Sequence, residues 1–204
     1  MKLSRMTFIK GAVVFLVAVW LAACAKPYHL NVNYTLPESP ATLDKTSIAV
    51  EVVDARKPAV VFSEKARNEF DKWDGTFVLA DPAMETSGNE ATGNFAELIR
   101  QALKKRLNSM NVDVVNEGTD GLPVLKLTLK KFFLDLKDRN WISDFRFDVE
   151  LSKDGSKTGR EQVKAQAERT KVMGKGGGQK LISDIFTEGI NRLNLEKLFE
   201  NAGF

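Results

Sequence analysis

The second half of the chain carries long stretches in which hydrophobic residues recur at every second position, and this period constrains the fold most strongly. Six of these residues form two alternating sets, Leu125, Leu127 and Leu129, then Phe132, Leu134 and Leu136. A period of two is typical of a strand with one buried face. The first set has odd residue numbers and the second has even ones. Both sets can therefore face the same core only if the strand contains one extra residue between them. We therefore predict a β-bulge at Lys130–Lys131.

Two further strands are predicted to follow in antiparallel order. Residues 145–151 alternate Phe, Phe, Val and Leu with charged residues, which is the pattern of a half-buried strand. The sequence Lys-Asp-Gly-Ser at 153–156 is a hairpin-turn signal. Residues 162–170 then supply the return strand, with Val163, Ala165 and Ala167 on its inward face.

Two segments have the hydrophobic period of an amphipathic helix. In residues 94–111 the apolar side chains recur at three- and four-residue steps, Asn94 and Glu97 resemble a capping box, and Asn111 suits a left-handed C-terminal stop. The second helix follows the glycine-rich residues 174–178. Its apolar stripe is Leu181, Ile182, Ile185, Phe186, Ile190 and Leu193, and residues 195–199 either extend it or begin a short added turn.

The first half of the mature chain is predicted to contain shorter strands. Residues 30–36 alternate apolar and polar side chains, residues 47–56 are rich in Val and Ile, and residues 76–80 form a weaker strand. Residues 81–93 are polar and glycine-punctuated, which predicts an exposed loop. The order strands, helix, strands, helix predicts a single α+β domain, in which two amphipathic helices pack on one face of a mostly antiparallel sheet.

The N-terminus has the three parts of an export signal. Lys2, Arg5 and Lys10 give a positive segment, and residues 11–22 are an apolar run too short for a comfortable transmembrane helix. The next four positions, Leu21-Ala22-Ala23-Cys24, resemble the lipobox of bacterial lipoproteins. The predicted division is a signal peptide at 1–23 that is removed, a lipidated N-terminus, tether and short first strand at 24–45, and one periplasmic domain at 46–204.

The lipobox resemblance implies that Leu21, Ala22 and Ala23 are recognised by the signal peptidase and that Cys24 carries an S-diacylglycerol and an N-acyl chain. One acyl chain gives only marginal membrane binding, with a partition constant of roughly 10⁴ M⁻¹, so two or three chains make a stable anchor. The alternative is an ordinary signal peptide with a chance cysteine. Residues 4–10 are similar to a twin-arginine signal, but Met6 replaces its second arginine, which favours the general secretory route.

Ala25 follows the lipidated cysteine, where an aspartate would be the usual inner-membrane retention signal. We therefore expect sorting to the periplasmic side of the outer membrane. The expected partners are the membrane itself, the lipoprotein processing and sorting machinery, and an envelope protein that the sequence does not identify. No segment of the mature chain is expected to span the membrane.

The charge of the mature chain gives no indication of nucleic-acid binding. The formal charge of +3 comes from 30 basic and 27 acidic residues, and the three basic residues of the signal account for the whole excess. No basic stripe with interleaved aromatics is present, so we expect no nucleic-acid partner. With Cys24 lipidated no thiol remains for a disulfide, because it is the one cysteine of the chain.

Few residues suggest a chemical site, and no catalytic residue, metal ligand or cofactor is predicted. His29, the one histidine, is expected in the solvated tether, which leaves no histidine triad or multi-histidine metal site within one chain. Asp54 and Arg56 share one side of a strand; they form either a charge pair where the strand leaves the core, or a conformational latch or partner contact. Trp141, at the tip between two strands, either packs over the sheet end or touches a membrane or partner.

An acidic cluster and a glycine-rich segment can each be interpreted either as a binding site or as an ordinary structural feature. The acidic residues Asp135, Asp138, Asp144 and Asp148 suggest a cation or acid–base site, but neighbouring lysines and arginines favour a solvated face. The glycine-rich residues 174–178 open a helix and offer backbone N–H groups to an anion. However, they lack the spacing of a phosphate-binding P-loop, which favours a connector.

The order of elements also resembles the YajG-type family of envelope lipoproteins. The resemblance is carried by the LAAC sequence, the valine-rich strand 50–56 that ends Asp-Ala-Arg, the passage 95–115 and the order of elements after Leu122. A second similarity, to auxiliary lipoproteins of ABC transport systems, is carried by Tyr34-Thr35-Leu36-Pro37. Neither family implies a catalytic residue.

The anchor and these resemblances favour a non-enzymatic envelope lipoprotein that binds or scaffolds other components. The alternative is an accessory subunit of an ABC-type lipid or lipopolysaccharide transport system. A third class, an envelope hydrolase that acts through carboxylates, requires a concave pocket in which two acids converge.

Overall fold

The computed structural model describes residues 28–38, 42–70, 72–80, 92–115, 121–153, 156–171 and 177–203. The predicted signal peptide and the lipobox residues Leu21–Cys24, with Ala25, lie outside this part of the chain. So do most of the predicted loop at 81–93, the two turn residues 154–155 and the glycine-rich residues 174–176.

The main sheet has five strands in the order β5-β2-β6-β7-β8. Their bounds are β2 Thr46–Asp54, β5 Val112–Val115, β6 Val124–Lys137, β7 Asn140–Lys153 and β8 Ser156–Thr170. β6, β7 and β8 pair antiparallel along most of their lengths, whereas β2 pairs parallel with both β5 and β6. The mostly antiparallel sheet is therefore confirmed, and the parallel pairings of β2 are a feature that the order of elements did not reveal.

The bulge predicted in β6 is present. The register against β7 shifts between Leu129 and Lys131, where Leu129 pairs with Phe147 and Lys131 pairs with Arg146. As a result, Leu125, Leu127 and Leu129 before the shift and Phe132, Leu134 and Leu136 after it are all buried. The extra residue keeps both halves of the strand facing one core.

A second, smaller sheet has the order β1-β3-β4, with β1 Tyr28–Asn33, β3 Trp73–Ala80 and β4 Thr92–Gly93. β1 and β3 are parallel, so both begin at the same end of the molecule. Leu30, Val32 and Tyr34 are fully buried. The chain is thus part of the folded domain from Tyr28 onward, and the expected tether does not extend through this region.

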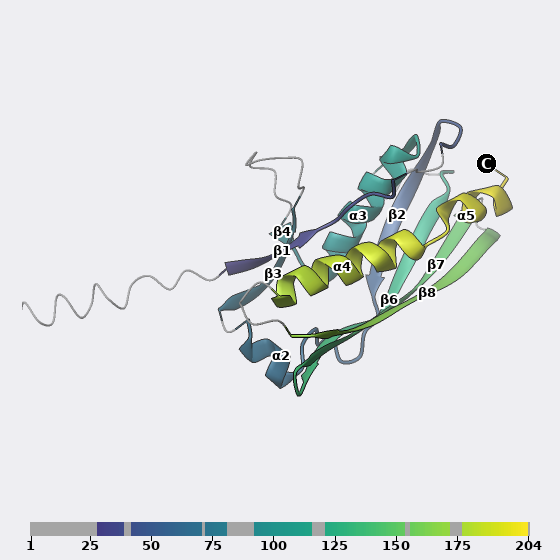
Figure 1. The fold of residues 1–204 in the computed structure, drawn as a ribbon. Coiled ribbons are helices and arrows are strands. Elements are labelled where there is room, and N and C mark those ends of the chain that lie inside the picture. The colour runs from purple at the N-terminus through teal and green to yellow at the C-terminus, as the bar shows by residue number, and fades with distance from the viewer. Residues whose placement is uncertain are drawn as a thin grey trace, which may run out of the picture.

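Two long helices form most of the layer that covers one face of the main sheet (Figure 1). They are α3 Phe95–Ser109 and α4 Gly177–Arg192, as predicted, and α5 Leu195–Asn201 is the short added turn. Asn94 caps α3 by accepting a hydrogen bond from the Glu97 N–H, and Asn111 has a left-handed φ of 69°. The short helix α2 Glu64–Asn68 was not predicted.

Aromatic side chains fill the space between the helices and the sheet. Phe145 of β7 is completely buried and lies 5.3 Å from Phe132 and 6.2 Å from Phe186, measured between ring centroids. α4 approaches this ring so closely that a Cβ atom added to Gly189 would lie 2.3 Å from Phe145 Cδ1. Close packing at this point fixes α4 on the sheet.

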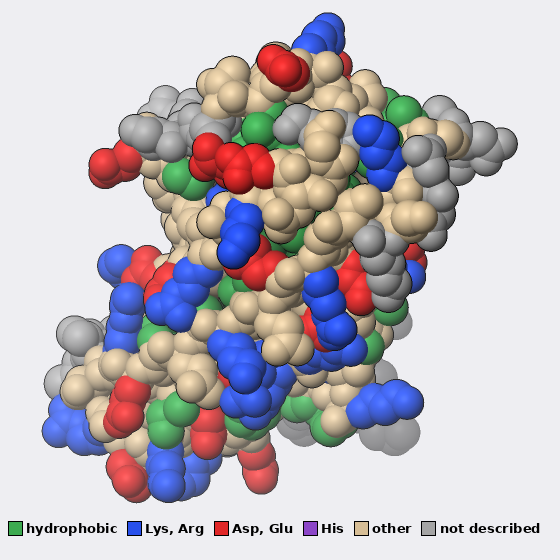
Figure 2. Space-filling model, turned by 90° about the vertical axis from the view of Figure 1, so that its right-hand side faces the viewer, with side chains coloured by type: hydrophobic (Ala, Val, Ile, Leu, Met, Phe, Trp, Pro, Cys, Tyr) green, Lys and Arg blue, Asp and Glu red, His purple; other side chains and the backbone are tan. Residues whose placement is uncertain are grey.

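The surface carries mixed charge. Figure 2 views the side that lies to the right in Figure 1, and acidic and basic side chains are interspersed there among small separate hydrophobic areas. Cross-strand charge pairs also occur on the main sheet, such as Lys126 Nζ with Glu51 Oε1 at 2.7 Å. Within the described residues, no helix is both long enough and apolar enough to span a bilayer.

Candidate functional site

The seam between β1 and α4 is joined by polar side chains of the helix. Ser183, Thr187 and Asn191 are spaced four residues apart, so they lie on one face of α4. Ser183 Oγ accepts the Asn33 N–H at 3.0 Å, and Asn191 Nδ2 donates to the Thr35 carbonyl at 3.0 Å. These side chains take the place of a neighbouring strand, because they satisfy backbone groups at the open edge of β1.

Thr187 and Tyr34 complete this seam. Thr187 Oγ1 donates to the Asn33 carbonyl at 3.2 Å, and the Tyr34 hydroxyl donates to Asn191 Oδ1 at 2.8 Å. Burial raises the pKa of the Tyr34 phenol well above its usual value, despite the nearby charge of Arg106. The phenol is therefore a neutral hydrogen-bond donor at physiological pH.

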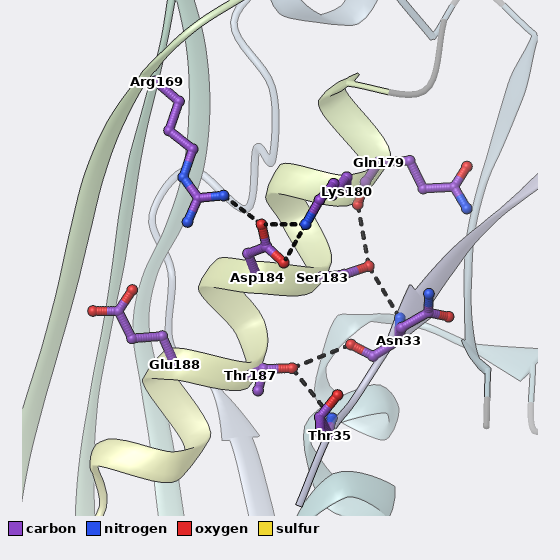
Figure 3. Close-up of a pocket in the computed structure, with 9 residues that line it drawn as sticks. All are labelled: Asn33, Thr35, Arg169, Gln179, Lys180, Ser183, Asp184, Thr187 and Glu188. Carbon is purple, nitrogen blue, oxygen red and sulfur yellow. Dashed lines mark hydrogen bonds and ion pairs between the residues drawn. The ribbon is translucent and has the colours of Figure 1, made fainter. Parts of the chain in front are cut away.

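A polar groove of about 960 Å³ runs along this seam and over the exposed side of α4 (Figure 3). Its lining residues are Asn33, Thr35, Arg169, Gln179, Lys180, Ser183, Asp184, Thr187 and Glu188. Asp184 receives ion pairs from Arg169 of β8 and from Lys180 one helical turn earlier. We call this cavity the β1–α4 groove.

A second cleft, of about 440 Å³, lies between the segment that follows β2 and the bulged part of β6. It is lined by Arg56, Lys57, Pro58, Val60, Lys130, Lys131, Phe132 and Phe133. Val60, which is 47% exposed, is the one large hydrophobic side chain that is exposed among the described residues. The cleft combines basic and apolar walls.

Arg56, which lines this cleft, forms a bidentate charge pair with Asp54. Arg56 donates from Nε to Asp54 Oδ1 at 2.9 Å and from Nη2 to Oδ2 at 2.6 Å. The Arg56 side chain is only 7% exposed, and its guanidinium carbon lies 5.6 Å from the centroid of the Phe95 ring. The hydrogen bond from Arg56 lowers the pKa of the Asp54 carboxyl. The charge pair is confirmed, and contact with a partner stays a prediction.

Trp141 is not an exposed tip. Its side chain is 3% exposed and packs near Phe70, with the ring centroids 6.0 Å apart. Asp138 and Arg139 connect the two strands at the tip, and Trp141 is the second residue of β7. Of the two alternatives for Trp141, the structure therefore shows packing over the sheet end, and the indole is too buried to form an exposed contact surface.

His29 also differs from the expectation. It lies in β1 instead of a solvated tether, and its Nδ1 is 3.0 Å from Asp74 Oδ2 of β3. The hydrogen bond from the Thr76 backbone is the largest influence that lowers the pKa of the Asp74 carboxyl, with smaller contributions from His29. This contact ties the start of β1 to the start of β3.

The acidic residues of the β6–β7 hairpin do not converge on one another. Asp144 is held by Lys131 Nζ at 2.8 Å and Arg146 Nε at 2.6 Å. Partial burial, the largest influence, raises the pKa of the Asp144 carboxyl, but the hydrogen bonds from both cations together lower it. In the part of the chain that the structure describes, no group of acidic, histidine or cysteine side chains has the arrangement of a metal site.

Sequence reasoning missed the residues of the β1–α4 groove. Ser183 and Thr187, which line the groove, and Asn191, which continues the seam beside it, lie on the polar side of an amphipathic helix, which sequence patterns treat as solvent-facing. Their four-residue spacing was the available signal, but it indicates a binding face only when β1 is known to lie beside the helix. Arg106 is a similar case, because it is buried in α3 and donates from Nη1 to the Ile190 carbonyl.

The arrangement defines an α+β domain in which two long helices cover one face of a larger sheet and a small sheet packs against those helices. No protein-family model matches the chain, and no curated protein sequence matches it. A solved structure of a DUF330 protein from Xanthomonas campestris is similar, with a TM-score of 0.55 at 8% identity over 85% of this chain and 97% of that one. This likeness shows a shared fold.

Solved structures of bacterial lipoproteins are more distantly similar. Rare lipoprotein B from Shewanella oneidensis has a TM-score of 0.40 at 10% identity, over 76% of this chain and 97% of that one. A minor lipoprotein from Acinetobacter baumannii has a TM-score of 0.39 at 13% identity, over 78% of this chain and 94% of that one.

Proposed function

We propose that this protein is a periplasmic lipoprotein anchored in the outer membrane, and that it acts as a non-enzymatic binding or scaffold component of the cell envelope. The observation that carries the proposal is the sequence Leu21-Ala22-Ala23-Cys24, placed directly after a positive segment and an apolar run. In this proposal Cys24 carries the lipid, and no cofactor beyond that covalent lipid is involved. The resemblance to the YajG-type family supports the same assignment.

A matched pair of variants tests the anchor and the sorting separately. Cys24→Ser removes the thiol that accepts the diacylglyceryl group, so the protein should lose its acyl mass and leave the membrane fraction. Ala25→Asp keeps the anchor but should move the protein to the inner membrane in density-gradient fractionation. Retention of Cys24→Ser in the membrane pellet, after cleavage at the same bond, refutes the lipid assignment.

The binding or scaffold role is supported by how the polar groups of the domain are used. Carboxylates such as Asp54, Asp144 and Asp184 are held by basic side chains and do not face one another. The β1–α4 groove and the cleft beside Arg56 are open surfaces that a partner can contact. In-cell crosslinking of the lipidated protein, followed by mass spectrometry, tests this role, and recovery of the protein alone counts against it.

A second candidate is an accessory lipoprotein subunit of an ABC-type lipid or lipopolysaccharide transport system. The observation in its favour is Tyr34-Thr35-Leu36-Pro37, which resembles the opening of those auxiliary proteins. Tyr34 has a specific position in the fold, because its hydroxyl joins β1 to Asn191 of α4. Co-purification with a transporter or an outer-membrane barrel distinguishes this role from a general scaffold.

A further inference from the structure

The distance between the proposed lipid site and the folded domain is short. Only Ala25, Lys26 and Pro27 separate Cys24 from Tyr28, the first residue of β1. An extended chain advances no more than ~3.6 Å per residue, so Cys24 and Tyr28 are at most about 14 Å apart whatever the conformation between them. A domain of this size has a radius of gyration of about 16 Å, so the connection is shorter than the diameter of the domain.

The connection cannot lengthen without disrupting the domain. Leu30, Val32 and Tyr34 are buried in the core. One edge of β1 pairs with β3. At the other edge, the backbone N–H of Asn33 donates to Ser183 and its carbonyl accepts from Thr187, both in α4. Releasing β1 would expose these apolar side chains to water and break the hydrogen bonds that β1 makes with β3 and α4.

The start of β1 lies at a defined end of the molecule. Tyr28 pairs with Trp73 of the parallel strand β3, and His29 contacts Asp74. The Trp73 N–H donates to the Phe70 carbonyl at 2.9 Å, which places α2 and the turn after it at the same end. We call this surface the proximal end, and it comprises His29, α2, Lys72, Trp73 and Asp74.

The opposite end is formed by α5 and the C-terminal half of α4. β1 and α4 run side by side in the same direction, because Asn33 contacts Ser183 and Tyr34 contacts Asn191 further along the helix. The 16 residues of α4 span about 24 Å, and α5 continues beyond its C-terminal end. In Figure 1 the start of β1 is at the left, and α5 and the C end are at the upper right.

We propose that the proximal end faces and contacts the lipid headgroup surface of the bilayer that holds Cys24, and that α5 points away from it. This proposal rests on the lipidation of Cys24 proposed above. A connection of about 14 Å cannot bring the α5 end to the bilayer with the domain inverted, because α4 alone exceeds that length. The exposed cations Lys65, Arg67 and Lys72 suit a headgroup surface, and the two acidic residues there are Glu64 and Asp74, the second of which is paired with His29.

This orientation determines which surfaces a partner can reach. The groove between β1 and α4 begins near the proximal end and runs away from the bilayer along the helix. The α5 end is open to the periplasm. A soluble partner therefore approaches α5 or the exposed side of α4, whereas α2 and the turn before β3 are occupied by the membrane surface.

Site-specific fluorescence in the full lipidated protein tests the orientation. Lys72→Cys at the proximal end and Glu200→Cys in α5 are both exposed positions, and each supplies the one free thiol when Cys24 is acylated. The labelled proteins are reconstituted into liposomes that carry a quencher on the lipid headgroup. We expect quenching of the label at position 72 to be several-fold stronger than at position 200.

A longer connection provides the control. Insertion of about 20 Gly and Ser residues between Pro27 and Tyr28 gives a root-mean-square reach of roughly 25 Å, which should reduce the difference between the two labels. Equal quenching at both positions in acylated protein without the insertion overturns the orientation. Absence of acyl chains from the N-terminal peptide, measured by mass spectrometry, instead refutes the proposed anchor, so the two failures are distinguishable.

Discussion

Replacement of Gly189 by alanine tests the packing of α4 on the sheet. An added Cβ would lie 2.3 Å from Phe145 Cδ1 and 2.6 Å from Phe145 Cε1. Ordinary contact between carbon atoms begins near ~3.5 Å, so the ring or the helix would have to move by about 1 Å. Phe145 is fully buried among Phe95, Phe132, Phe147 and Phe186, which leaves the ring no free volume.

Two opposing effects decide the magnitude. Overpacking of a core typically destabilises by about 1–3 kcal/mol, and this contact is at the severe end. Alanine favours a helix over glycine by roughly 1 kcal/mol, which offsets part of the loss. We expect Gly189→Ala to lower the free energy of unfolding by about 2 kcal/mol, and the melting temperature by roughly 4–8 °C for a domain of this size.

Urea unfolding, followed by circular dichroism, measures this change. The double variant Gly189→Ala with Phe145→Leu serves as the control, because leucine lacks the ring atoms that the added methyl group meets. The two substitutions should therefore be less destabilising together than the sum of their separate effects. A Gly189→Ala protein that is more stable than the parent would show that helix propensity outweighs the contact, and would refute the packing argument.

Three smaller predictions concern polar contacts. Asp54→Asn should destabilise by about 1–2 kcal/mol because the buried Arg56 loses its counter-ion. Arg56 lowers the pKa of the Asp54 carboxyl in the folded protein. The resulting stabilisation is fully present above the unfolded pKa of about 3.9, and it is lost as the pH falls through the lower folded pKa. The free energy of unfolding of the variant should therefore depend less on pH in this acidic range. Tyr34→Phe should lower the free energy of unfolding by about 1–2 kcal/mol by leaving Asn191 Oδ1 unpaired, measured by urea unfolding. Asn94→Ala should lower it by about 1 kcal/mol through loss of the α3 cap, and an unchanged midpoint would contradict that role.

Much of the fold was predictable because its signals are local. The Leu and Phe alternation in β6 required a bulge, and the register shift between Leu129 and Lys131 supplies it. The stripe from Leu181 to Leu193 predicted the buried face of α4, and those residues are buried. In each case the period of the hydrophobic residues matches the geometry of one element, so no distant contact is needed to interpret it.

The candidate surfaces were less predictable because they depend on contacts between distant segments. Ser183 meets Asn33 across 150 positions of sequence, and the groove beside them exists only through that contact. α2 was missed because five residues are too few for a helical hydrophobic period to be recognised. The sequence correctly predicted that Trp141 lies at a strand end. Its burial, however, depends on contact with Phe70, a residue of the turn after α2.

The sequence by itself determined the α+β class, the two long helices, the bulged strand and the expectation of a lipid at Cys24, because each follows from the chemistry of neighbouring residues. Only the tertiary structure decided that β1 belongs to the domain, since its edge is satisfied by α4 and by β3. That result leaves three residues between the lipid site and the fold. The length of the connection between the lipid and the domain is therefore set by how β1 packs against α4 and β3, which lie far from it in the sequence.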